Sequence, residues 1–222
     1  MTSPTPPTRR FDYVATGPAI YADSFATIRA EADLSSIPAG AEQVAVRMIH
    51  GSGQVDLVRD LVVHPRLGEA GRAALAAGAP VITDARMVAV GITAGRLPAG
   101  NEVMCFLNDE RVPALAQQWA TTRSAAAVSL WEPHLEGAVV AIGNAPTALF
   151  HLMEMLVDGA PRPAAIIGCP VGFIGAAESK EALAALADTH GVDVPFVTVR
   201  GRRGGSAMTS SAVNALASVS EA

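Results

Sequence analysis

The sequence has few lysines, cysteines and aromatic residues, and it has no long hydrophobic run. Of its 16 basic residues only Lys180 is a lysine, and aromatic residues make up 5% of the 222 positions. A membrane-spanning helix needs about 20 consecutive apolar residues, and no run reaches that length. Cys105 and Cys169 lie in apolar segments, which favours two small buried side chains over a disulfide. Residues 1–10 lack the apolar core of a signal peptide, so we predict a cytoplasmic protein.

The charge balance excludes several classes of partner. Half of the residues are hydrophobic and only 17% are charged, which indicates a compact protein. The formal net charge of −5 argues against nucleic acids and anionic membranes as partners. The preference for arginine over lysine fits anion recognition, because guanidinium groups bind carboxylates and phosphates in pairs of hydrogen bonds. Genomic base composition produces the same preference, so only the positions of particular arginines are informative.

Short apolar segments alternate with helical patterns from residue 80 onward. Each of the five predicted strands is followed by a helix; the strands are 80–83, 102–107, 137–142, 164–167 and 195–199. This alternation predicts an α/β fold, a three-layer doubly wound sheet of about five parallel strands with helices on both faces. Asp84 is expected to cap the helix after the first of these strands, and residues 113–130 are expected to form one long helix.

Helices are also expected before this alternation. The patterns predict helices over residues 17–32, over a segment that ends near residue 50, and over residues 69–77, with a further short strand at 61–63. We see no internal repeat and no linker. The expected organisation is a flexible lead-in over residues 1–10, followed by one α/β domain over residues 11–222.

The helix that ends at His50 is the first candidate functional element. Ser36 is a possible N-cap, Pro38 suits the first turn, and Gly51 is expected to take the left-handed conformation that ends the helix. The carbonyl end of a helix favours an imidazolium, and Arg47 lies one turn earlier near the same face. The alternative interpretation is a histidine that only caps the last carbonyl groups.

Two turns carry candidate anion-binding groups. Residues 143–147 place backbone N–H groups, including that of Asn144, at the start of a helix. Residues 201–206 combine Arg202, Arg203, glycines and a serine before another helix. An ordinary tight turn explains the first segment equally well, and a solvated basic turn is the alternative for the second.

The residues alone give little support for metal or nucleophile chemistry. No GxSxG elbow is present, although a Ser-His-Asp triad stays open. No metal-ligand spacing links the cysteines with the histidines, which are His50, His64, His134, His151 and His190.

Several motifs, taken in order, resemble those of one family. The chain is similar to the precorrin-8X methylmutases of corrin (vitamin B12) biosynthesis over nearly its whole length after residue 10. The matching segments are residues 17–20, 24–25, 28–31, 47–50, 83–88, 143–149, 170–180 and 201–206.

This resemblance implies a cofactor-independent isomerase that moves a methyl group from C11 to C12 of the precorrin-8X macrocycle to give hydrogenobyrinate. It implies that His50 protonates the ring that carries the migration, and that Ser24, Arg47, Thr93 and Arg123 contact the substrate. It also implies a doubly wound parallel sheet and a homodimer with pockets near the subunit contact. A substrate with several acetate and propionate arms would also suit Asn144, Arg202 and Arg203, and no metal site is expected.

Two alternatives stay open at this stage. The substrate of the anaerobic route is cobalt-precorrin-8, and the motifs do not separate it from the metal-free substrate. The protein could also be a corrinoid carrier without turnover, although the histidine at position 50 argues against that.

Overall fold

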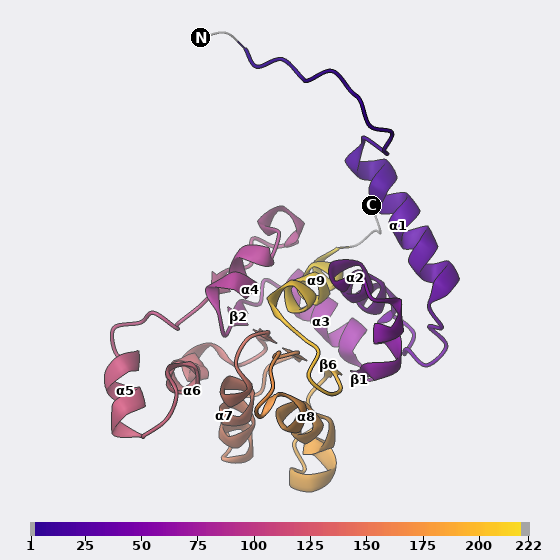
Figure 1. Ribbon diagram of the computed structural model, residues 1–222. Coiled ribbons are helices and arrows are strands. Elements are labelled where there is room, and N and C mark those ends of the chain that lie inside the picture. Colours follow the sequence, from indigo (N-terminus) through magenta and orange to yellow (C-terminus); the bar gives the residue numbers. More distant parts are fainter. Residues whose placement is uncertain (1–2, 219–222) are drawn as a thin grey trace.

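The computed structural model describes residues 3–218, which form a six-stranded sheet covered by helices on both faces (Figure 1). The strand order is β1-β6-β5-β4-β2-β3. The strands are β1 (Leu61–Val63), β2 (Val81–Thr83), β3 (Val103–Met104), β4 (Val139–Ile142), β5 (Ala165–Gly168) and β6 (Phe196–Val199). The five predicted strands are all present and parallel, which confirms the fold class, and β1 adds an antiparallel edge beside β6.

Alternate residues of the central strands face two separate cores. In β4, Val139 and Ala141 pack with α1 (Gly17–Glu31), α2 (Glu42–Ser52), α3 (Leu67–Ala76), α4 (Arg86–Gly91) and α9 (Ser206–Ala217). Val140 and Ile142 face the other side, where they pack with α6 (Arg123–Val128), α7 (Pro146–Val157) and α8 (Ala176–His190). Successive side chains of a strand point to opposite faces of the sheet. A strand that is apolar at every position therefore contributes to the core on each face.

Three of the expected helix boundaries are wrong. The segment expected as one helix over 113–130 is α5 (Val112–Gln118), α6 and the 3-10 helix η3 (Ser129–His134). The break falls where Ala120 takes a positive φ of 49° and the Thr122 hydroxyl accepts a hydrogen bond from the Ala125 N–H, which caps α6. The helix α2 begins at Glu42, so Ser36 and Pro38 lie before it. The short helix α4 has no side-chain cap, so Asp84 does not cap it.

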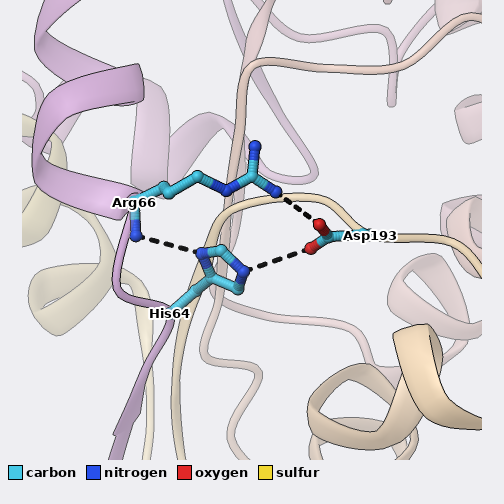
Figure 2. Close-up of polar contacts among 3 residues, drawn as sticks. All are labelled: His64, Arg66 and Asp193. Carbon is cyan, nitrogen blue, oxygen red and sulfur yellow. Dashed lines mark hydrogen bonds and ion pairs between the residues drawn. The ribbon is translucent and has the colours of Figure 1, made fainter.

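Two further 3-10 helices, η1 (Val55–Asp60) and η2 (Ala94–Arg96), connect these elements. At the amino end of the parallel strands, the segment after β1 is joined to the segment before β6 by three residues (Figure 2). His64 Nδ1 accepts a hydrogen bond from the Arg66 N–H, and its Nε2 lies 3.1 Å from a carboxylate oxygen of Asp193. Arg66 donates to the second oxygen of Asp193 at 2.6 Å. Both segments are therefore fixed at the edge opposite the loops that follow the parallel strands.

Residues 3–10 contain no helix or strand and are exposed. Together with residues 11–16 they extend away from the body of the molecule and lead into α1 (Figure 1). Within residues 3–218, no helix combines the length and the apolar character that a membrane crossing requires.

Candidate active site

His50 lies in the last turn of α2, next to the amino half of α9. Gly53, rather than the predicted Gly51, ends α2 in the left-handed conformation at a φ of 67°. Gly51 is needed for packing instead, because a Cβ at this position would lie 2.4 Å from the Ser211 hydroxyl of α9. This close approach holds the end of α2 against α9, the helix that follows β6. The half-buried imidazole is therefore placed by two packed helices.

Helix α1 supplies the groups that surround the imidazole. The Ser24 hydroxyl lies 2.8 Å from His50 Nδ1. The ring centroids of Tyr21 and Phe25 lie 5.4 Å and 5.3 Å from that of His50. These three residues have the spacing of one helix face, and the hydrogen bond to Nδ1 leaves Nε2 for another partner. Tyr21 and Phe25 were not among the predicted site residues, although their helical spacing on the same segment as Ser24 was a usable signal.

Arg47 is buried in the same cluster. Its side chain is only 6% exposed, and its guanidinium carbon lies 5.1 Å from the centre of the Phe25 ring. Within residues 3–218, its Nε and Nη2 atoms have no hydrogen-bond partner. A buried guanidinium without an acceptor is costly, so this position suits a group that an anion completes.

The pKa of His50 is shifted opposite to the direction expected from its place at a helix end. Burial, followed by the nearby Arg47 guanidinium, lowers the pKa of His50 from its ordinary value of 6.5. Burial and the guanidinium charge therefore both disfavour the imidazolium. Burial, together with the charge of Arg96, also lowers the pKa of Arg47.

The crevice between the carboxyl ends of β2 and β4 is filled by a side chain of the protein. Doubly wound sheets commonly bind ligands at such a point, where the connections leave toward opposite faces. Here the Asp84 carboxylate accepts hydrogen bonds from the N–H groups of Gly143, Asn144 and Ala145 at 2.8–2.9 Å. The backbone N–H groups predicted as an anion site thus already hold an anion, and only the exposed side chain of Asn144 faces outward.

The basic turn after β6 is only partly available to a ligand. Arg203 forms ion pairs with Asp56 and Asp60 of η1, and its carbonyl oxygen accepts a hydrogen bond from the buried Lys180. Arg202 is exposed, and its guanidinium lies 5.1 Å from the centre of the exposed Phe173 ring. Arg203 therefore has a structural role in this conformation, whereas Arg202 presents its charge to solvent.

Two further predicted residues, Thr93 and Arg123, lie on opposite faces of the sheet. Thr93 is exposed beside α9, and its N–H donates to the Asn214 side chain at 2.8 Å. Arg123 begins α6 on the other face of the sheet from α2, and it donates to the Leu107 carbonyl oxygen at 3.1 Å (Figure 1). The structure thus brings Ser24, Arg47 and His50 together and places Arg123 on the other face of the sheet.

These features define a class of protein. It is a doubly wound α/β protein in which a histidine, held by a serine, lies beside a buried arginine with two guanidinium nitrogens that find no acceptor among residues 3–218. Within residues 3–218, no three His, Cys, Asp or Glu side chains are placed to share a metal ion. The chemistry available at the cluster is proton transfer and the binding of anionic groups.

Comparison with known proteins gives the family. Residues 19–219 match the family described as CbiC, precorrin-8X methylmutase. A precorrin-8X methylmutase from Pseudomonas aeruginosa is 63% identical over 210 residues, which cover 95% of this chain and 99% of the relative. One from Sinorhizobium sp. is 60% identical over 207 residues, covering 93% and 97%. A cobalt-precorrin-8 methylmutase from Priestia megaterium is 39% identical over 174 residues, covering 78% and 75%.

The solved structure of a precorrin-8X methylmutase from Thermus thermophilus has a TM-score of 0.80 and 38% identity, and it covers 90% of this chain and 95% of its own. The chain therefore belongs to the precorrin-8X methylmutase family. It is an isomerase of the methylmutase type, as its motifs predicted.

Proposed function

We propose that this enzyme moves a methyl group from C11 to C12 of precorrin-8X, giving hydrogenobyrinate, and that His50 is the general acid. The observation that carries this proposal is the cluster of Ser24, Arg47 and His50. An imidazole held at Nδ1 lies beside a buried guanidinium whose Nε and Nη2 atoms have no hydrogen-bond partner among residues 3–218. Precorrin carboxylates are the kind of group that such a guanidinium binds.

The reaction balances without an oxidant or reductant. His50 donates a proton to a pyrrolic nitrogen, which makes the ring system electron-poor. The bond from C11 to the methyl carbon breaks as the bond from C12 forms with the same electron pair. The proton then returns to His50, so the product has the formula of the substrate. Holding the substrate and supplying one proton are the contributions expected of the protein.

The low pKa of His50 in the unbound enzyme gives the substrate a second role. A carboxylate arm that pairs with Arg47 adds negative charge next to the imidazole and offsets the repulsion from the guanidinium. In this proposal His50 becomes a competent acid mainly in the substrate complex. Further substrate contacts are proposed for Thr93, Arg123, Asn144, Arg202 and Arg203, several of which present exposed side chains.

The metal-free substrate is favoured over the cobalt-bearing one. Identity is 60–63% to relatives named for precorrin-8X and 39% to the Priestia megaterium relative named for cobalt-precorrin-8. Turnover should be followed by absorbance with the two substrates offered in parallel. Conversion of metal-free precorrin-8X supports the proposal, and conversion of only the cobalt form would assign the enzyme to the alternative substrate. Tight binding with no conversion of either substrate would identify a carrier.

We also propose that the enzyme is a homodimer and that it works in the cytoplasm. Phe11 and Tyr13 are 80% and 59% exposed on the segment that extends before α1, and a second copy would cover such apolar side chains. The cytoplasmic location suits the unpaired Cys105 and Cys169. Light scattering at micromolar concentration tests the dimer, and a fully active monomer would contradict it.

A further inference from the structure

A cavity of about 760 Å³ lies along α1, beside the His50 cluster. Its α1 side is largely apolar and includes Tyr21, Ala22 and Phe25. The ring of Phe25 contacts this cavity as well as both Arg47 and His50. Arg96, from the 3-10 helix η2, lines the cavity too. Arg29 of α1 lines it as well, and Phe25 is the residue that the cavity shares with the His50 cluster.

Arg47 and Arg96 both lack an acidic partner in the part of the chain that the structure describes. Arg47 is nine-tenths buried, and two of its guanidinium nitrogens have no acceptor there. Arg96 is partly buried, and the hydrogen bond found for it is a long one of 3.5 Å to the Ser218 hydroxyl. The two arginines share Phe25, whose ring lies 5.1 Å from the Arg47 guanidinium carbon and lines the cavity together with Arg96. Burial and then the charge of Arg96 lower the pKa of Arg47. Two neighbouring cations without a carboxylate between them are stabilised by an anion that binds both.

We propose that Arg47 and Arg96 bind one and the same carboxylate arm of the macrocycle, seated in the cavity along α1. This inference rests on the proposed function for the identity of the ligand. The apolar lining from Tyr21 and Phe25 suits the methylene groups and ring edge next to such an arm, whereas the two guanidinium groups hold its oxygens. Arg96 is then a substrate-binding residue that fixes the macrocycle next to His50.

The test is a titration of the full-length enzyme and its variants with hydrogenobyrinate, followed by absorbance. Arg96→Ala and Arg47→Ala should each weaken binding by about 10- to 100-fold, the effect of losing one charge-assisted hydrogen bond. Because both residues bind the same carboxylate, the double variant should lose clearly less than the product of the two single losses. Fully methyl-esterified product should bind the wild-type enzyme weakly and should not distinguish the variants.

Arg66→Ala is the matched control, because Arg66 is an exposed arginine that is paired with Asp193 at the opposite edge of the sheet (Figure 2). Its product affinity should equal that of the wild type. If Arg96→Ala does not fold, as judged from its melting temperature, Arg96→Gln keeps the length of the side chain and removes the charge.

A folded Arg96 variant that binds hydrogenobyrinate with wild-type affinity would overturn the inference. A double variant whose loss of affinity equals the product of the two single losses would show that the two arginines do not share one carboxylate. Failure of the proposed function is distinguishable from both outcomes. An enzyme that converts neither precorrin substrate still reports on the arginine pair through its affinity for the product.

Discussion

The Ser24 hydroxyl lies 2.8 Å from Nδ1 of His50, although 26 positions separate the two residues in the chain. Ser24 belongs to α1 and His50 to α2, so the contact depends on how these helices pack. It fixes the orientation of the imidazole and directs Nε2 away from α1. The hydroxyl can donate to a neutral ring or accept from a protonated one, so it supports both states of a general acid.

Ser24→Ala should lower turnover by about 3- to 10-fold, the effect of losing one neutral hydrogen bond that orients the acid. The matched control is Thr27→Ala, which removes an exposed hydroxyl from the same helix that donates to the Asp23 carbonyl oxygen. Single-turnover rates of both variants check this prediction. Equal rates in Ser24→Ala and Thr27→Ala would mean that the contact does not orient the catalytic ring.

The pH dependence should differ between the unbound enzyme and the substrate complex. Because His50 must be protonated to act, activity should fall as the pH rises through its pKa. Burial and Arg47 lower this pKa in the unbound enzyme, so kcat/KM should fall from below pH 6.5. In the complex a carboxylate offsets Arg47 while the burial remains, so kcat should fall at a higher pH than kcat/KM does.

Rate profiles for the wild type and Arg47→Ala check this account. Removal of the guanidinium should move the fall in kcat/KM to higher pH, because one cause of the lowered pKa is gone. A rate that increases with pH in the wild type would identify a general base and contradict the assignment.

Asp84→Asn should destabilise the fold by about 2–4 kcal/mol, because an amide cannot replace a buried carboxylate that accepts three N–H groups. Asp109→Asn is the control, since Asp109 accepts its hydrogen bonds from the neighbouring Arg111 and does not connect distant segments; it should cost less stability than Asp84→Asn. Urea unfolding measures both variants. Equal unfolding midpoints in the two variants would show that the hydrogen bonds accepted by Asp84 do not hold the ends of β2 and β4 together.

The sequence was sufficient to predict the parallel strands. Their residues are apolar on both faces, and helical patterns separate one strand from the next. Patterns of this kind report the burial of each segment, and β2, β4, β5 and β6 followed them closely. The helical pattern singled out Arg47 and His50, whereas Ser24 came from motif resemblance, and periodicity alone would not have paired Ser24 with His50.

Features that depend on contacts between distant segments were missed. Asp84 resembled a helix cap, but its three donors lie about 60 positions further along the chain. Gly51 resembled a helix end, but it is required for the close approach of α9. The pKa of His50 followed burial and Arg47 rather than the helix end, because desolvation by α1 is a tertiary effect that local sequence does not contain.

The central claim is that His50 supplies the proton, and the single-turnover rate of His50→Ala tests it most directly. The rate should fall by about 10²–10⁴-fold, the range expected for loss of a general acid, while the melting temperature and product affinity change little. His151→Ala is the matched control, because His151 is also half-buried, lies 2.7 Å from a serine hydroxyl and belongs to the other face of the sheet. It should keep nearly the full rate. A His50→Ala variant that is stable, binds product tightly and turns over at the wild-type rate would contradict the account.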